Sequence, residues 1–454
     1  MAYDNKKIRV LIACFMLLVS VCMMLLENIS SSALSVPIAQ ISALPAIAYY
    51  VWLHYKNNPR FVLSGFYQIY AFSGLLLSAL TISFGTYMLE VDKAGTANGA
   101  FWVSVIFLIL GSEGALIGFK IGNNKGSVRK KRIMPRRLGK RLAIMLLLAT
   151  LLSAVLIMLF FKGPVLAGLD RVTFWRSVPP PLNNFPSLLG QSFFIAAYLY
   201  QSGKDESKRA RIFGLVVLMY IFFTVFVSGE KFSAFMIYIF GWMVIKAGFA
   251  RDFRVQINDY VRWVMIGALI VMLLVYSYVA NEKEAGFIFS RIALQAQLLW
   301  SVLNEDVMRL LLGGDWGCYF GCRDFASGVE LISARYVPPA LWEFYSEAGS
   351  GLTGFMPSLP ILLYGFPIAL ILHLAASLLL GFIQAKTVAA VRSRDVIYAF
   401  LMFKIYLGVT IFWYAAKELV LPGIVVTIIL LISLKFFIKR NAYSKSNDGQ
   451  SGAT

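Results

Sequence analysis

Charged residues, histidine and cysteine are all scarce in this chain. Only 14% of its 454 residues are charged, and it contains two histidines and four cysteines. Soluble domains carry about a quarter charged residues, so this composition excludes an ordinary water-soluble fold. Four cysteines do not make a disulfide framework. Cys318 and Cys322 could pair if their loop faced an oxidising compartment, and two unpaired small residues are the equally open alternative.

Sequence motifs for metal and nucleotide chemistry are also missing. The chain has no HExxH pattern, no CxxC pair, no Asp-x-Asp on the outer side and no P-loop. We therefore expect no metal site, no cofactor and no ATP hydrolysis. Neither His54 nor His373 falls in a loop assigned to the outer side, and both are expected to be packing or interface residues. A general base on the outer side then has to be a carboxylate.

Apolar segments long enough to cross a bilayer recur from one end of the chain to the other. Hydrophobic residues make up 59% of the sequence, and the mean hydropathy is +0.73. A helix needs about 20 apolar residues to span the hydrocarbon layer, whereas a strand barrel would show alternating segments of about ten. The sequence predicts an all-α polytopic membrane protein, with about twelve transmembrane helices in a single membrane domain covering 1–454. The predicted spans are 9–26, 32–53, 61–84, 101–119, 142–161, 187–200, 212–228, 232–250, 263–280, 359–383, 396–414 and 419–438.

Basic residues set the predicted orientation. The net charge of +19 would suit a nucleic-acid partner, because a basic face binds phosphate backbones. The Lys and Arg residues instead collect in alternate loops, above all 120–141, which is the bias that orients membrane proteins. We therefore expect no nucleic-acid partner and place that loop and both termini in the cytoplasm. Two long loops, 162–186 and 281–357, then face outward, and the second is a large periplasmic loop between helices 9 and 10.

The apolar stretch 287–312 is not counted as a span. It is interrupted by charged side chains such as Arg291, Glu305 and Arg309, which are costly in hydrocarbon. An extra crossing would also turn the basic residues that follow the tenth span outward. We expect a helix that lies along the outer interface or packs over the helical bundle.

The first outer loop has two arginines, Arg171 and Arg176, on either side of Phe174 and Trp175. Three prolines, 179–181, stiffen the chain that follows. The planar guanidinium suits phosphate oxygens, and an aromatic face suits a sugar ring. The alternative is that all four side chains are interfacial anchors.

The second outer loop combines cations, carboxylates and aromatic rings, as a site for a charged carbohydrate would. A folded outer cap would contain much the same residues. Among its acids, Glu343 and Glu347 lie closest to a glycine cluster at 349–354 and are the candidate general bases. The candidate cations of this loop are Arg291, Arg323 and Arg335.

Two lysines stand out elsewhere. Lys231 belongs to a tight outer turn, 228–231, where it would contact substrate or form an ion pair within the turn. Lys404 lies within a predicted span, where a charge is costly. It would pair with Glu113 or Glu418, or else snorkel or face an internal cavity.

The topology, the late large outer loop and the outer arginines together resemble the O-antigen and oligosaccharide repeat-unit polymerases of the Wzy type. The segment GLTGFMPSLPILLYGFP, 351–367, resembles the point where family members enter a span after their large periplasmic loop. The turn SGEKFS, 228–233, resembles their small-small-Arg turn, with Lys231 in the basic place. Some relatives have paired arginine-led repeats in their two main loops, and none of the outer arginines here fits that spacing.

The resemblance implies a glycosyltransferase of the bacterial inner membrane that acts on oligosaccharides linked to polyprenyl pyrophosphate. A hydroxyl of one glycan would attack the anomeric carbon of another and release the lipid pyrophosphate. Arg171, Arg176, Arg291 and Arg335 would bind that leaving group, and Glu347 or Glu343 would accept the hydroxyl proton. Implied partners are lipid-linked oligosaccharides, membrane lipids, a chain-length regulator and a flippase.

Two other functions compete with the polymerase. A related ligase transfers finished glycan to a lipid acceptor, and the lack of an outer histidine disfavours it. A lipid-linked glycan flippase or transporter would place charges along a central pathway and show repeated halves. Here the polar residues gather in the outer loops instead, and no internal repeat is visible.

Overall fold

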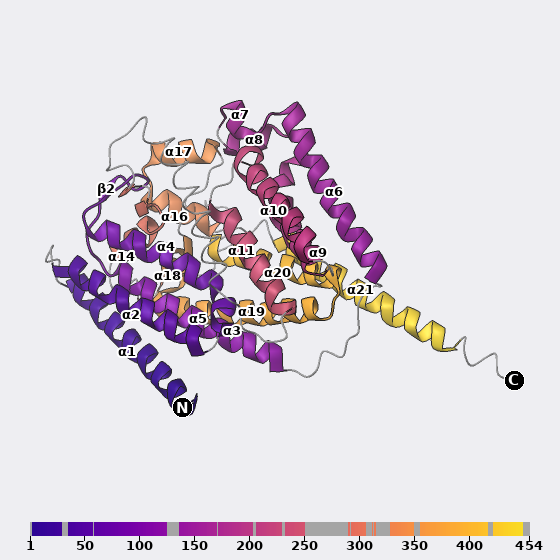
Figure 1. The fold of residues 1–454 in the computed structure, drawn as a ribbon. Coiled ribbons are helices and arrows are strands. Elements are labelled where there is room, and N and C mark those ends of the chain that lie inside the picture. Colours follow the sequence, from indigo (N-terminus) through magenta and orange to yellow (C-terminus); the bar gives the residue numbers. More distant parts are fainter. Residues whose placement is uncertain are drawn as a thin grey trace. The chain divides into compact units, whose positions relative to one another are not determined.

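The computed structural model divides the chain into two compact units, each described by itself. The first unit comprises Met1–Ile121, Leu274–Phe382 and Thr410–Glu418, and the second comprises Gly122–Leu273, Ile383–Val409 and Leu419–Thr454. Helices dominate both units (Figure 1). The structure describes residues 2–29, 35–57, 59–124, 136–169, 171–202, 206–228, 232–249, 289–290, 292–305, 311, 313–314, 327–348, 355–415 and 421–447.

Within these ranges, seven helices are long and apolar enough to cross a membrane. Three shorter apolar helices accompany them: Ile212–Val227, Met236–Phe249 and Leu421–Leu434. The prediction of an all-α polytopic membrane protein is thereby confirmed. The total of about twelve transmembrane helices stays a prediction, and the predicted span 263–280 lies outside the described residues. The seven long segments are Val10–Glu27, Val36–His54, Phe66–Ser83, Ala100–Asn123, Arg137–Ala167, Phe366–Arg392 and Val396–Tyr414.

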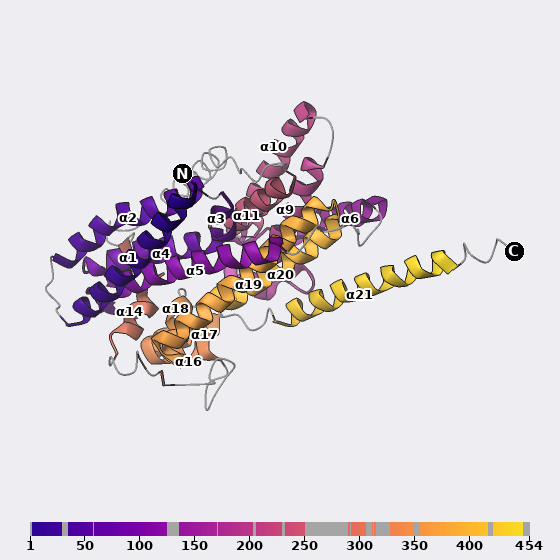
Figure 2. The ribbon, with the colours of Figure 1, turned by 90° about the horizontal axis from the view of Figure 1, so that it is seen from below.

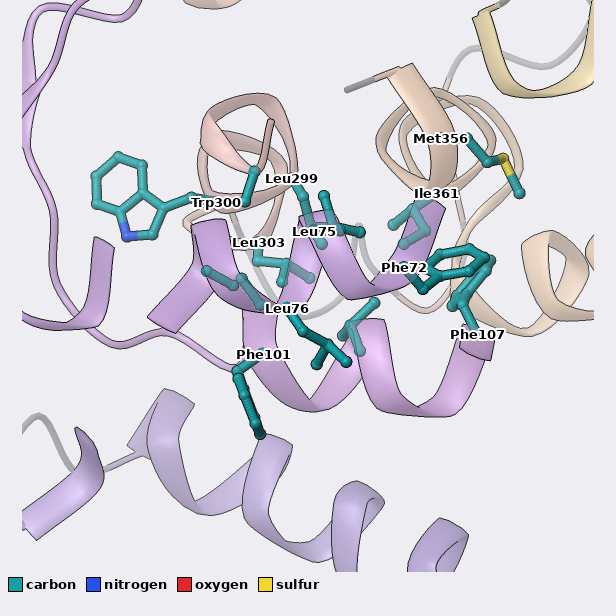
Figure 3. Packing of buried hydrophobic residues seen from close by; sticks show 14 of the residues in the cluster. Phe72, Leu75, Leu76, Phe101, Phe107, Leu299, Trp300, Leu303, Met356 and Ile361 are labelled. Atoms are coloured by element: carbon teal, nitrogen blue, oxygen red, sulfur yellow. The ribbon is translucent and has the colours of Figure 1, made fainter. Parts of the chain in front are cut away.

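The first unit is organised around α5, whose apolar window is 83% buried against 22% for α1. Its core also draws on segments from the predicted outer loop, as Figure 3 shows for Leu299 and Leu303 of α14 beside Leu76 of α4. The elements are α1 (Ala2–Ile29), α2 (Ser35–Asn57), α3 (Pro59–Ser64), α4 (Phe66–Ser83), β1 (Tyr87–Met88), β2 (Lys93–Ala94), α5 (Ala100–Asn124), α14 (Gln297–Leu303), α16 (Gly328–Tyr336), α17 (Pro339–Ala348), α18 (Phe355–Tyr364) and the first part of α19 (Phe366–Arg392).

Small residues let α5 approach α19 closely. A Cβ atom on Gly118 would overlap the backbone of Leu378, and one on Gly381 would overlap the backbone of Ala115. Gly114 and Gly118 form a GxxxG pattern on α5, which is typical of membrane helices in backbone contact. The two helices therefore run alongside one another, as Figure 2 shows.

The second unit is built around α9, which contacts α6, α10 and α11. Phe194 of α9 stacks on Phe403 of α20 with ring centroids 4.2 Å apart. A π-helical segment, η2, continues α10 to Val227. The elements are α6 (Arg136–Phe160), α7 (Pro164–Ala167), α8 (Arg171–Ser177), η1 (Leu182–Asn184), α9 (Phe185–Gln201), α10 (Glu206–Phe222), η2 (Phe223–Val227), α11 (Phe232–Phe249), the last part of α19, most of α20 (Val396–Ala415), and α21 (Leu421–Asn447).

Two predicted spans are broken in the structure. The predicted span 61–84 divides at Gly65 into α3 and α4. The predicted span 359–383 divides at Gly365, whose φ of +78° ends α18, and α19 then continues to Arg392. A left-handed backbone conformation cannot continue a right-handed helix, and it suits glycine because glycine has no Cβ atom.

The stretch 287–312 is packed rather than laid along an interface in its described part. All seven residues of α14 are buried. This helix contacts α4, α16 and α18. Of the two alternatives raised by the sequence, packing against other helices is the one observed.

Candidate functional site

In the first unit, residues 84–99, α14, α16 and Glu305 are joined by hydrogen bonds between polar groups and are here called the outer cap. The indole Nε1 of Trp300 donates to the Thr96 carbonyl over 2.7 Å, and Asn98 Nδ2 donates to the Trp300 carbonyl over 2.7 Å. Gln297 donates to the carboxylate of Glu90. These bonds satisfy polar groups that burial would otherwise leave without partners, so the two loop regions are held together.

Helix α16 begins at a side-chain N-cap. Ser327 is the N-cap, and its hydroxyl accepts from the backbone N–H of Glu330 over 3.2 Å. This Ser-x-x-Glu spacing is a frequent signal for the start of a helix. The helix therefore starts at Gly328 and places Arg335 and Tyr336 in its last turn.

Both of these residues bind Glu305, which follows α14. Arg335 Nε donates to Glu305 Oε1 over 2.7 Å, and the Tyr336 hydroxyl donates to the same oxygen over 2.6 Å. The Arg335 guanidinium also lies 5.8 Å from the centroid of the Tyr336 ring. The side chains of Arg335 and Glu305 are 30% and 19% exposed, so the pair is partly open to solvent. A guanidinium fixed in direction suits recognition of a phosphate, although Glu305 also balances its charge.

The two candidate bases lie on α17, which contacts α16. Glu343 is exposed. Glu347 follows it four residues later on the same helix, and its side chain lies outside the described part of the structure. The structure therefore brings the helix of Arg335 beside the helix of both candidate carboxylates.

The first predicted outer loop lies in the second unit. Arg171 and Arg176 are exposed on α8. Trp175 donates its indole N–H to the Ser228 carbonyl over 3.0 Å, and Phe174 is only 2% exposed. The prediction that the aromatic faces beside these arginines stack on a sugar is wrong for Phe174, because its ring packs inside the unit. The Trp175 indole instead attaches α8 to the end of η2.

The structure does not describe all of the remaining predicted cations. Lys231, Arg291 and Arg323 lie outside the described residues. Arg335 and the α8 arginines belong to different units, so a single cluster of all the predicted cations stays a prediction.

Sequence reasoning gave no functional role to Glu305 or Tyr336, and it overlooked Glu27. Glu27 is 4% exposed at the end of α1 and accepts from Trp102 Nε1 over 2.6 Å and from the Gly99 N–H over 3.0 Å. Gln40 Nε2 donates to it over 3.2 Å. The sequence signal for Glu27 was a lone carboxylate at the end of an apolar run. This signal was not enough, because the groups that donate hydrogen bonds to Glu27 come from distant segments of the chain.

The histidines are packing residues, as expected. His373 is fully buried, with Nε2 3.0 Å from the Phe107 carbonyl, and its Nδ1 accepts from Trp413 Nε1 over 3.3 Å. A ring that donates through one nitrogen and accepts through the other is a neutral imidazole.

His54 is also fully buried. Its Nε2 lies 3.0 Å from Glu113 Oε1, and its ring stacks on Phe61 with centroids 4.0 Å apart. The pairing of Glu113 with Lys404 would join the two units and stays a prediction, whereas Glu418 lies outside the described residues.

No group of three or more His, Cys, Asp or Glu side chains suited to a metal ion occurs in the described part of the chain. The fold defines a helical membrane protein whose predicted outer loops carry packed polar segments. Searches with protein-family models, among curated proteins and among solved structures give no match to this chain.

Proposed function

We propose that this chain is a membrane glycosyltransferase of the Wzy type, which polymerises lipid-linked oligosaccharide repeat units at the outer face of a bacterial inner membrane. The observation that carries the proposal is the Glu305–Arg335–Tyr336 cluster in the outer cap. It provides a cation of fixed direction beside the helix that bears Glu343 and Glu347. A transporter would need its charged groups along a path through the spans rather than in a packed cap.

In the proposed reaction, a sugar hydroxyl of the acceptor glycan attacks the anomeric carbon of the donor glycan. A new glycosidic C–O bond forms while the C–O bond to the polyprenyl pyrophosphate breaks. Glu347 or Glu343 accepts the hydroxyl proton, and the arginines stabilise the negative charge on the leaving pyrophosphate. Arg171, Arg176, Lys231, Arg291, Arg323 and Arg335 are the proposed cations for this charge.

Surface glycan on a gel tests the proposal. A deletion strain is expected to lose long chains while it keeps single-repeat products, because polymerisation fails but export continues. Arg171→Ala, Arg291→Ala and Arg335→Ala should reproduce that pattern, and Lys56→Ala, an exposed residue on the predicted cytoplasmic side, should not. Normal chain length in all three arginine variants would contradict the proposal. Loss of even the single-repeat product in the deletion strain would favour a flippase.

A further inference from the structure

The second unit contains an apolar groove between α6, α9 and the α10–η2 segment. Its volume is about 390 Å³. Leu148 of α6 and Ile212 of α10 line it and are each 59% exposed, so the groove is open along its side. The lining also includes Leu189 and Tyr200 of α9 and Val216, Tyr220 and Phe223 of the α10–η2 segment.

Hydrogen bonds within the protein satisfy the hydroxyl groups of Thr150 and Tyr220 in this lining. The Thr150 hydroxyl donates to the Leu146 carbonyl over 2.9 Å. The hydroxyl of Tyr220 lies 2.8 Å from that of Ser192, behind the groove wall on α9. The surface offered to an occupant is therefore mainly hydrocarbon, which favours an apolar chain and disfavours a polar head group.

The groove is elongated along one helix. Along α9 it extends from Leu189 to Tyr200, a rise of about 16 Å at about 1.5 Å per residue. That is roughly half of the hydrocarbon thickness of a bilayer. Such a shape matches part of one extended hydrocarbon chain that lies across the membrane.

Cations lie beyond one end of the groove. Phe223 lines the groove and begins η2, and Ser228 directly follows η2, one helical turn further along the axis. Trp175 of α8 binds the carbonyl of Ser228, so Arg171 and Arg176 on α8 are held near that end. Figure 1 shows α7 and α8 at the same end of this unit as the end of α6. The sequence of α8, RVTFWRS, contains two arginines.

We propose that this groove binds the isoprenoid tail of a polyprenyl pyrophosphate, with the pyrophosphate directed toward Arg171 and Arg176. Charge complementarity selects this occupant over a bulk phospholipid, because a pyrophosphate carries more negative charge than one phosphodiester and two guanidinium groups match it better. The inference rests on the proposed function, since it names where that enzyme would bind its lipid-linked substrate.

Groove-filling variants of the full chain, purified in detergent, test the inference. The probe is a radiolabelled long-chain polyprenyl pyrophosphate without sugars. Leu148→Trp and Val216→Trp place an indole in the groove and should weaken binding about tenfold, because a filled site excludes the tail. Leu152→Trp and Leu215→Trp are the matched controls. Their residues are 59% and 68% exposed and lie outside the lining, so binding should stay unchanged.

Competition distinguishes the possible occupants. Unlabelled phosphatidylglycerol should fail to displace the probe, and the double variant Arg171→Ala/Arg176→Ala should weaken binding of the pyrophosphate but not that of the free polyprenol. Displacement by phosphatidylglycerol as effective as by the unlabelled probe would overturn the inference in favour of an ordinary membrane lipid. Full-strength binding by both groove-filling variants would overturn it as well.

Glycan length in cells separates the two proposals. If Leu148→Trp and Val216→Trp lose probe binding while deletion of the chain leaves long glycans intact, the groove binds the lipid but the polymerase proposal fails. If both variants bind the probe normally while deletion of the chain still removes long glycans, the groove inference fails and the polymerase proposal stands.

Discussion

The Nε–H group of Arg335 donates to Oε1 of Glu305 over 2.7 Å and thereby joins the end of α16 to the chain that follows α14. The Tyr336 hydroxyl reaches the same oxygen over 2.6 Å. This one carboxylate therefore sets the direction of a guanidinium in the predicted outer loop. Because the pair is partly exposed, it stabilises the fold only by about 0.2–1 kcal/mol, so its removal tests function more than folding.

Arg335→Ala and Arg335→Lys should both remove long surface glycans while the melting temperature of the purified protein stays nearly unchanged. Lysine keeps the positive charge but lacks the planar fork and the Nε–H that binds Glu305. Glycan gels and thermal unfolding in detergent measure the two effects. Normal glycan length with Arg335→Lys would show that charge alone suffices, and a large loss of stability would show a structural role instead.

Trp175→Phe should loosen α8 from the second unit. The substitution keeps an aromatic ring but removes the donor to the Ser228 carbonyl, at a cost of about 0.5–1.5 kcal/mol. We expect faster trypsin cleavage after Arg171 and Arg176 in spheroplasts, and weaker binding of the polyprenyl pyrophosphate. Trp52→Phe, at a residue 49% exposed in the first unit, should leave both the trypsin cleavage rate and the binding of polyprenyl pyrophosphate as in the wild type. Equal cleavage in the two variants would argue against this attachment.

Gly118→Ala should destabilise the first unit by about 1–3 kcal/mol, because the added methyl group would overlap the Leu378 backbone and force α5 away from α19. Gly74→Ala on α4 is the matched control, since nothing lies within 4 Å of the added Cβ atom there. That change should be neutral or slightly stabilising. Thermal unfolding in detergent compares the pair, and equal melting temperatures would refute the close helix contact.

Glu27→Ala should lower stability by at least about 1–3 kcal/mol, because the Trp102 indole and the Gly99 N–H would lose their acceptor in a buried site. Glu27→Gln should cost less, since its amide oxygen can still accept one of these bonds. Exposed Glu343→Gln should leave the unfolding curve unchanged. A Glu27→Ala protein as stable as the wild type would contradict a structural role for this carboxylate.

The predicted orientation can be measured by thiol labelling. In a chain whose four cysteines are replaced by serine, Arg171→Cys and Glu343→Cys should react with a membrane-impermeant reagent in intact spheroplasts. Lys56→Cys should react only after permeabilisation. All three residues are exposed, so access across the membrane decides the result. Labelling of position 56 from outside intact spheroplasts would show that the predicted orientation is reversed.

The candidate site was only partly predictable. Arg335, Glu343 and Glu347 were identified from their residue types and their place in one long loop, and the structure places their helices in contact. The role of Glu305 was missed because its partners lie about 30 residues further along the chain. Phe174 was misjudged because sequence alone does not show which side of the short α8 helix faces inward.

That this is a helical membrane protein follows from the amino-acid order alone, because the length of an apolar run relative to the hydrocarbon layer is a local property. Three features could not be predicted in that way: where α18 ends, how closely α5 and α19 approach, and which hydroxyl groups of the groove are satisfied within the protein. Each of these depends on contacts or backbone angles that arise only when separate helices pack. The same holds for the Arg335–Glu305 pair, whose partners meet only in the folded cap.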